Sequence, residues 1–125
     1  MTSGSAPVGA FLPDVHTVVI EESGRASVLV ASGELDAFAA PDIASAFREI
    51  EGAARVLVDL GRVSFMDSTA LGIIVRHVRA LGAQDVRVQV VLPEGFARRI
   101  FEITTLDRVL PVAGTRDEAL ATLRA

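Results

Sequence analysis

The sequence predicts an α/β domain with a single mixed, mostly parallel β-sheet of about five strands and about four helices. From Ala26 onward, short β-branched runs alternate with segments whose apolar residues recur at helical spacing. The lengths of these segments suit right-handed crossovers between parallel strands. Two β-rich runs at the start are joined by the turn Ser23-Gly24-Arg25, which predicts an antiparallel hairpin at one edge of the sheet.

The elements are expected in the following order. The first half has strands at 16–20 and 26–31, a loop at 32–36, a helix from Pro41 to about Glu51, and a buried central strand at 55–60. The second half has a polar loop at 61–66, a helix from 67 to 81 ended by Gly82, a strand at 86–92, a helix at 94–104, a short strand at 108–112, and a last helix. Thr115, with Glu118 three residues later, forms a capping-box pattern that opens this last helix.

Size and composition indicate one folded domain. The chain has 125 residues, half of them hydrophobic and 22% charged, which argues against global disorder. We expect a flexible N-terminal tail over residues 1–13, rich in small residues, and the domain over 14–125. No apolar run approaches the roughly 18 residues of a membrane helix, and the start lacks the features of a signal peptide. We therefore expect a cytoplasmic protein without a membrane partner.

The residue types argue against several functions. There is no Cys, and the two histidines, His16 and His77, are not spaced as a metal pair. No Gly-rich phosphate loop occurs, and a serine at a helix start without an assigned base is not a hydrolase site. The net charge is −4, the arginines are scattered, and Trp and Tyr are absent. We expect no enzymatic activity, no metal, no cofactor and no direct nucleic-acid partner.

The cluster Asp67-Ser68-Thr69 follows a buried strand and sits at a predicted helix N-terminus. Plain capping, in which Asp67 or Ser68 bonds the free N–H groups of the first turn, explains such a cluster on its own. The helix that follows adds a second signal, because at 100° per residue its two faces differ. The predicted core face is Leu71, Ile74, Val75, Val78 and Leu81, and the outer stripe is Thr69, Gly72, Ile73, Arg76 and Ala80. A small, apolar stripe beside a polar helix end predicts a docking surface, with contact to another part of the same chain as the alternative.

Two further aspartates are candidates. Asp36 follows a strand of a largely parallel sheet, so we expect it at the same end of the sheet as Ser68. Its alternative role is that of a turn residue. Asp59 lies inside a predicted strand, which favours a structural role in hydrogen-bonding a nearby loop.

Three segments together resemble a known family. The segments are Gly33-Glu34-Leu35-Asp36, Asp59-Leu60 and Phe65-Met66-Asp67-Ser68-Thr69-Ala70-Leu71-Gly72. They look like the STAS domain (sulfate transporter and anti-sigma antagonist), and more narrowly the free-standing anti-sigma factor antagonists of bacteria. The likeness runs from about residue 16 to 123 and implies a STAS-like fold.

The family motif Asp-Ser-Ser-Gly-Leu-Gly aligns with this sequence without a gap. Its phosphorylated serine falls on Ser68, and its first aspartate falls on Asp67. Thr69 replaces the second serine and keeps a hydroxyl group, whereas Ala70 replaces the first glycine and adds a methyl group in the first helical turn. Thr105 stands where the family often has glycine.

The resemblance implies a two-state function. The unphosphorylated chain is expected to bind an anti-sigma factor, itself a serine kinase, and so to free a sigma factor; phosphorylation at Ser68, or as second choice at Thr69, releases the kinase. A PP2C-type phosphatase is the other expected partner, and the chain is expected to be a monomer or weak dimer. The expected partner-binding residues are Asp36, Asp67, Ser68, Thr69, Gly72, Ile73 and Arg76.

Other uses of such a domain stay open. It could serve as a stressosome scaffold, as a regulatory subunit of a lipid-transport ATPase, or as a small-ligand or nucleotide sensor. The short chain and the intact Ser68 favour the free-standing antagonist.

Overall fold

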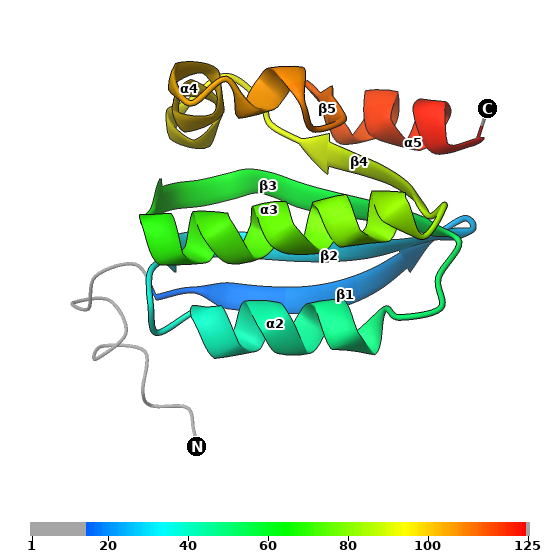
Figure 1. Cartoon of the computed structure of the whole chain (residues 1–125), viewed down its shortest axis with the longest axis horizontal. Helices are drawn as coiled ribbons and strands as arrows, with labels where there is room; N and C mark the ends of the chain where they lie inside the picture. The colour runs from blue at the N-terminus through cyan, green and yellow to red at the C-terminus, as the bar shows by residue number, and fades with distance from the viewer. Residues whose placement is uncertain (1–14, 125) are drawn as a thin grey trace, which may run out of the picture.

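The structure, a computed structural model, describes residues 15–124; the tail predicted at 1–13 lies outside the described residues. One sheet runs in the order β1-β2-β3-β4-β5 (Figure 1). Its strands are β1 (Thr17–Ser23), β2 (Ala26–Leu35), β3 (Arg55–Met66), β4 (Arg87–Val91) and β5 (Val112–Ala113). β1 pairs with β2 in antiparallel fashion, and every other neighbouring pair is parallel. The predicted fold class and the edge hairpin are confirmed.

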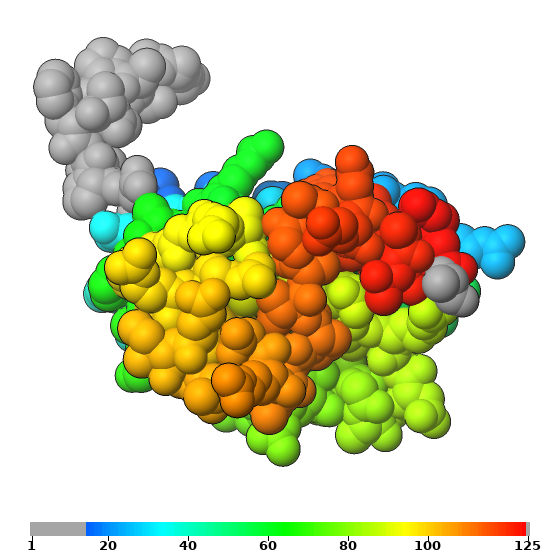
Figure 2. Space-filling view, turned by 90° about the horizontal axis from the view of Figure 1, so that it is seen from above, coloured from blue at the N-terminus to red at the C-terminus, as the bar shows by residue number. Residues whose placement is uncertain are grey.

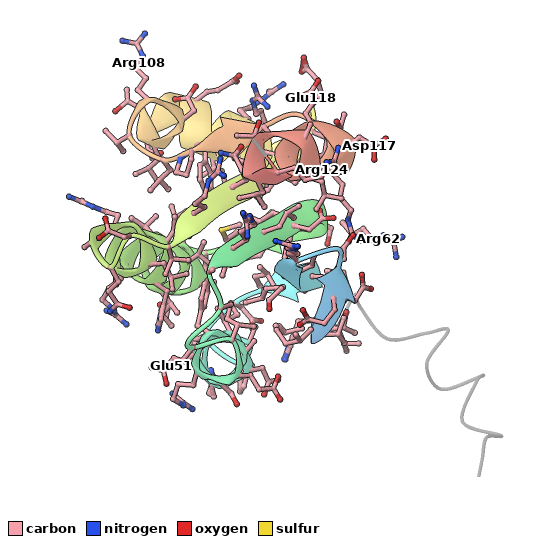
Figure 3. All side chains as sticks on the ribbon, turned by 90° about the vertical axis from the view of Figure 1, so that its right-hand side faces the viewer. Glu51, Arg62, Arg108, Asp117, Glu118 and Arg124 are labelled. Carbon is pink, nitrogen blue, oxygen red and sulfur yellow. The ribbon has the colours of Figure 1, made fainter. Side chains whose placement is uncertain are left out.

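Helices cover both faces of this sheet. They are α2 (Ala40–Glu49), α3 (Ser68–Ala83), α4 (Phe96–Ile103) and α5 (Arg116–Arg124), with a short 3₁₀ helix, η2 (Leu106–Arg108). Seen end-on, α2 and α3 lie on one side of the strands and α5 lies on the other (Figure 3). The segment from α4 through η2 to α5 forms one surface of the molecule (Figure 2).

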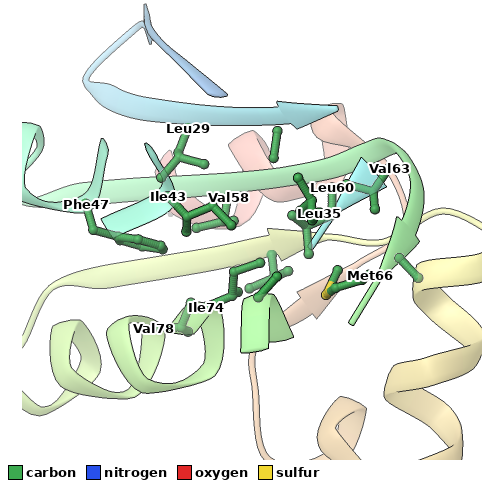
Figure 4. Packing of buried hydrophobic residues seen from close by; sticks show 14 of the residues in the cluster. Leu29, Leu35, Ile43, Phe47, Val58, Leu60, Val63, Met66, Ile74 and Val78 are labelled. Carbon is green, nitrogen blue, oxygen red and sulfur yellow. The ribbon is translucent and has the colours of Figure 1, made fainter. Parts of the chain in front are cut away.

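The alternation of side chains along the strands produces two cores. On the α2–α3 side, Leu29, Val58 and Leu60 pack against helical residues such as Ile43 and Ile74 (Figure 4). On the α5 side, the buried residues are Ala26, Val28, Val30, Leu57, Val91, Ala119 and Leu123. Successive residues of a strand point to opposite faces of the sheet. The continuous apolar runs that predict buried strands therefore contribute side chains to both cores.

Two segments predicted as loops, 32–36 and 61–66, are largely strand instead. β2 and β3 stay paired through these segments to their last residues, with irregular register. The path of β2 requires glycine at position 33. The φ of Gly33 is 81°, and a Cβ there would lie 2.1 Å from the backbone oxygen of Val15. Such irregularities break the alternation that predicts a strand, so the sequence pattern ends before the strand does.

The end of α3 differs from the prediction that Gly82 ends it. The helix runs through Gly82 to Ala83, and Asp85 takes the left-handed conformation beyond it, with φ 63°. The N–H of Val86 donates to the oxygen of Leu81, and the N–H of Asp85 donates to the oxygen of Gly82. This is a Schellman ending, in which aspartate takes the position that glycine usually fills.

The elements after β4 are shorter than predicted. Helix α4 starts at Phe96, after Gly95, and not at residue 94. The strand predicted at 108–112 is reduced to β5, and η2 precedes it. Pro111 has no N–H to donate, so only its carbonyl group joins the sheet, accepting from the N–H of Val90 at 2.8 Å. At the start of α5, the N–H of Glu118 donates to the Thr115 hydroxyl group at 3.1 Å, which is one of the two bonds of the predicted capping box. The Glu118 carboxylate accepts the N–H of Gly114 at 3.1 Å in place of the second bond, to the N–H of Thr115.

Residues 15–124 contain neither a membrane-spanning helix nor a metal-binding cluster. None of the helices there is both long and apolar enough to cross a membrane. No three His, Cys, Asp or Glu side chains of this range are grouped so as to hold a metal ion.

Asp59 links β3 to α5, in the structural role predicted for it. Its Oδ2 accepts from Nε of Arg116 at 3.0 Å and forms an ion pair with Nη2 at 2.9 Å, and its Oδ1 accepts the N–H of Gly61 at 2.8 Å. Nη1 of Arg116 also donates to Glu21 on β1 at 3.1 Å. Burial alone lowers the pKa of Arg116, but the hydrogen bonds to Glu21 and Asp59 outweigh it and raise the pKa above the ordinary value.

We expect the Asp59–Arg116 pair to contribute measurably to stability. The Asp59 side chain is only 14% exposed, so little solvent screens the pair from that side. A double-mutant cycle with Asp59→Asn and Arg116→Gln, measured by urea unfolding, should give a coupling free energy of about 1 kcal/mol. The control is the surface pair Arg98–Glu102, separated by 3.7 Å, whose coupling should stay below about 0.5 kcal/mol. Equal couplings in the two cycles would contradict this expectation.

Thr105 has left-handed backbone geometry, with φ 59° and ψ 17°. A β-branched side chain is disfavoured there, which explains why glycine suits the position. Thr105→Gly should therefore raise the free energy of unfolding by about 0.5–1 kcal/mol in urea titrations, even after the larger entropy of glycine in the unfolded chain. Thr104→Gly is the matched control and should lower stability, because Thr104 has φ −88° and its hydroxyl group donates to Ile100. A loss of stability in Thr105→Gly would show that the backbone conformation does not limit this position.

Candidate partner-binding site

The carboxyl ends of β2 and β3 bring two predicted site residues together, at the left end of the molecule in Figure 1. The last residues of the strands, Leu35 and Met66, are register partners, and the N–H of Asp67 donates to the oxygen of Leu35 at 3.0 Å. Asp36 and Asp67 therefore follow adjacent strands spaced about 5 Å apart. As expected from the parallel topology, Asp36 lies at the same end as Ser68. Asp36 is also a turn residue, since its Oδ1 accepts the N–H of Phe38 at 3.0 Å.

Asp67 takes the capping role at the start of α3. Its backbone is extended, with φ −94° and ψ 176°, and its Oδ1 accepts the N–H of Ala70 at 2.9 Å. Capping was open between Asp67 and Ser68, and the structure assigns it to Asp67. Ser68 is consequently the first helical residue, and its side chain is exposed. Within residues 15–124 its hydroxyl group forms no hydrogen bond, which leaves it available to a partner.

The two residues after Ser68 point in different directions. Thr69 is exposed, so it presents a second hydroxyl group at the helix start. Ala70 is fully buried and belongs to the core on the α2–α3 side. The extra methyl group of Ala70, relative to the glycine of the family motif, therefore faces the interior and does not obstruct access to Ser68.

A shallow groove of about 520 Å³ runs along α3 from Ser68, and we call it the α3–η2 groove. Its lining residues are Ser68, Leu71, Gly72, Val75, Arg76 and Arg79 of α3 and Leu106 of η2. The predicted Gly72 and Arg76 are exposed, and a Cβ placed on Gly72 would meet no atom within 4 Å. The glycine therefore leaves open space in the groove that the fold itself does not need.

Some groove residues were missed, and one predicted residue lies elsewhere. Leu71 and Val75 were assigned to the core, but both are half-buried and also line the groove. Ile73, expected in the outer stripe, is half-buried and packs against the core. The reason is that α2 covers this side of α3, as the stack of His77 on Phe47 at 4.6 Å shows. A helical wheel locates faces but does not say which neighbouring helix covers them.

Exposed phenylalanines accompany this end of the sheet and were also missed. Phe38 follows Asp36 and is 85% exposed. Phe65, at the end of β3, is 42% exposed and stacks on Phe96 of α4, 45% exposed, with ring centroids 5.8 Å apart. Exposed aromatic side chains are typical of protein-binding surfaces, since they supply large contact area at low entropic cost. Sequence patterns cannot reveal such exposure, because it depends on which elements come together.

This arrangement favours binding over catalysis. Each histidine is bonded to a group other than Ser68. Nε2 of His16 lies 2.6 Å from Oδ2 of Asp42, and Nδ1 of His77 lies 2.9 Å from the oxygen of Ile73. Among the described residues, the site thus consists of an exposed hydroxyl group, two carboxylates, a groove with apolar and arginine side chains, and exposed aromatic rings.

Comparisons with known proteins agree with this picture. A family model for the STAS domain matches residues 17–119. The anti-sigma-B factor antagonist of Staphylococcus aureus (strain NCTC 8325 / PS 47) is 33% identical over 82 residues, 64% of this chain and 76% of that protein. A protein of the same name from Staphylococcus epidermidis is 34% identical over the same length.

Solved structures show the same relationship. The crystal structure of an anti-sigma factor antagonist from Mycobacterium paratuberculosis superposes with a TM-score of 0.84 at 30% identity, covering 91% of this chain and 98% of that one. The Bacillus cell fate determinant SpoIIAA in its phosphorylated form gives a TM-score of 0.66 at 27% identity, covering 85% and 98%. With a family model that spans most of its length and with its fold shared by these structures, the chain belongs to the STAS domain family.

Proposed function

We propose that this protein is an anti-sigma factor antagonist, a binding protein whose affinity is switched by phosphorylation of Ser68. The unphosphorylated form binds an anti-sigma factor that is a serine kinase, and a sigma factor is thereby freed for transcription; a PP2C-type phosphatase restores this form. The observation that carries the proposal is the exposed, unbonded hydroxyl group of Ser68 at the N-terminus of α3, beside the α3–η2 groove. The names of the relatives support it.

The position of Ser68 determines how a phosphate group would act. Phosphorylation adds about −1.5 to −2 charges at neutral pH. At a helix N-terminus, free N–H groups and the helix dipole favour an anion by about 0.3–1 kcal/mol. The phosphate therefore leaves α3 intact. SpoIIAA, solved in phosphorylated and unphosphorylated forms, has nearly equal TM-scores of 0.66 and 0.67 to this chain, in line with a fold that tolerates phosphate.

Release must then come from the interface. A partner docked over Ser68 would have to desolvate the phosphate dianion, and Asp67 and Asp36 add negative charge beside it. Burying an uncompensated charge, together with like-charge repulsion, costs a few kcal/mol, which lowers affinity by orders of magnitude. The same aspartates are compatible with a neutral serine, so the unmodified site stays open to binding.

Two features support a macromolecular partner. The groove combines apolar side chains with Arg76 and Arg79, neither of which forms an ion pair with a residue in the described range. The exposed rings of Phe38, Phe65 and Phe96 extend the surface around the helix start. Asp36, Asp67, Ser68, Thr69, Gly72 and Arg76 are thus proposed as contacts, with Ile73 as a peripheral one. We further propose that the protein acts in the cytoplasm as a monomer or weak dimer.

Incubation with ATP and the candidate anti-sigma kinases of the source organism should place one phosphate on the peptide that contains Ser68, as measured by mass spectrometry. Ser68→Ala should abolish this phosphate and keep kinase binding, because it removes only the hydroxyl group. Thr69→Ala is the matched control and should be phosphorylated normally. Phosphate on Thr69 alone would move the switch by one residue, and phosphate on neither would contradict the proposal.

The phosphorylated protein should lose at least about a hundredfold in affinity for the kinase while its thermal unfolding midpoint changes by no more than a few degrees. Affinity is measured by titration calorimetry and unfolding by circular dichroism. The Ser68→Asp variant is a weaker mimic and should shift affinity in the same direction. A large loss of stability in the phosphorylated protein would contradict the proposal that phosphate acts at the interface and not on the fold.

Gly72→Leu tests the groove without damaging the helix. Leucine is a better helix former than glycine by about 0.5–1 kcal/mol, and nothing in the chain lies within 4 Å of the added Cβ, so stability should hold or rise. The larger side chain fills the groove, so affinity for the kinase should fall at least tenfold. Gly82→Leu is the control, because Gly82 is also an open position on α3 but lies about 15 Å farther along the helix. It should leave affinity unchanged, and equal effects of the two variants would refute the groove as the docking surface.

A further inference from the structure

The end of the molecule opposite Ser68 carries a pocket that the proposed function does not use. β2 and β3 start there, at Ala26 and Arg55, and they end beside Ser68, roughly 30 Å away at about 3.3 Å per residue. The pocket has a volume of about 320 Å³, and we call it the basic pocket. Its lining residues are Ser23, Gly24, Arg25, Ala26, Arg55, Leu120, Leu123 and Arg124. Figure 3 looks onto this end, with Arg124 labelled on α5.

Arginines supply the charge of the basic pocket, and no acidic residue of the range 15–124 is among its lining. Three arginines line it. Arg25 and Arg124 are exposed and make no ion pair or hydrogen bond with any other residue of the range 15–124. The chain as a whole has a net charge of −4, so this cluster runs against the overall charge. Unpaired guanidinium groups that converge on a cavity indicate an anionic ligand.

Arg55 has a structural task that also holds it in position. Its Nε donates to the backbone oxygen of Leu123 at 2.8 Å, and its cross-strand neighbour Arg87 donates to the oxygen of Thr122 at 2.7 Å. Both arginines therefore bind the last carbonyl groups of α5, where the helix dipole favours cations. The two terminal nitrogens of Arg55 have no partner within the described range. Capping of α5 explains Arg55 and Arg87, but it does not explain Arg25 or Arg124.

The remaining lining of the pocket is apolar. Ala26 and Leu123 are buried, and Leu120 is half-buried, so they form an aliphatic floor beside the arginines. The volume lies at the lower end of the roughly 300–1,000 Å³ of ligand pockets. Guanidinium groups pair with phosphate and carboxylate groups alike, but three positive charges in a lining without an acidic residue of the range 15–124 suit a dianion better than a monoanion.

We propose that the basic pocket binds a small organic phosphate. The phosphoryl group pairs with Arg25, Arg55 and Arg124, and the apolar part of the ligand rests on Leu120 and Leu123. This site goes beyond the proposed function and does not depend on it, because a ligand of this size in the pocket cannot reach Ser68.

The test is an NMR titration of the ¹⁵N-labelled protein with phenyl phosphate. Saturable shifts are expected at the amides of Gly24 and Leu123, and none at Ser68. Benzoate, which is a monoanion, and inorganic phosphate, which lacks the apolar part, should each bind at least about fivefold more weakly. Added salt should weaken the binding of phenyl phosphate.

Charge-neutral variants identify the arginines. Arg25→Gln and Arg124→Gln should each weaken binding at least about fivefold, since each removes a charge-assisted contact. Arg62→Gln and Arg108→Gln are the controls, because both arginines are exposed and neither lines the basic pocket; Figure 3 shows Arg108 well apart from Arg124. Arg55 is not changed, because its loss would also uncap α5. Circular dichroism checks that every variant is folded.

Three results would overturn the proposal. These are no saturable shift at Gly24 or Leu123 up to about 10 mM phenyl phosphate, unchanged affinity in the Arg25→Gln/Arg124→Gln double variant, or the same loss in Arg108→Gln. Inorganic phosphate binding as tightly as phenyl phosphate would refute the role of the leucines. The double variant should still bind the kinase normally. The two proposals can therefore fail independently: loss of the phosphate site would leave the switch at Ser68 intact, and failure of the switch would leave the phosphate site intact.

Discussion

The parallel pairing of β2 with β3 is the constraint on which the rest of the structure depends. The two strands stay paired to Leu35 and Met66, across two register shifts, and the hydrogen bond from the N–H of Asp67 to Leu35 extends this pairing by one residue. Because most side chains of β2 and of the first half of β3 are buried, a slip in their register would expose apolar side chains. The start of α3 is therefore held at a defined point at the edge of the sheet, and Ser68 with it.

Capping and switching are complementary at this helix start. A single acceptor is enough to satisfy the N–H of Ala70, and Asp67 provides it. Ser68 is then not needed as the N-cap of α3, so its chemical modification does not have to disturb the fold. A serine that served as the cap itself would couple phosphorylation to helix stability. The division of tasks between two adjacent residues separates the proposed signal from the scaffold that carries it.

The two ends of the sheet have different chemical characters. The carboxyl ends of β2 and β3 carry Asp36, Asp67 and exposed aromatic rings, whereas their amino ends carry arginines around the C-terminus of α5. The buried residues of the described range are apolar, and the partly exposed Asp59–Arg116 pair ties β3 to α5. Since the ends lie roughly 30 Å apart, ligands at the two ends do not touch, and each end can be studied by itself.

Local patterns in the sequence were sufficient for the fold class, the hairpin, the order of the elements and the placement of Ser68 at a helix N-terminus, because periodicity, turn residues and capping act over a few neighbours. They failed where distant segments meet. The pairing of β2 with β3 beyond residue 31, the replacement of glycine by Asp85 at the end of α3, and the cover of Ile73 by α2 all depend on contacts between elements. The same holds for the site. The hydroxyl group of Ser68 could be named from the sequence, but the α3–η2 groove, the exposed phenylalanines and the basic pocket exist only where separate elements converge, and tertiary structure alone decides which side chains those are.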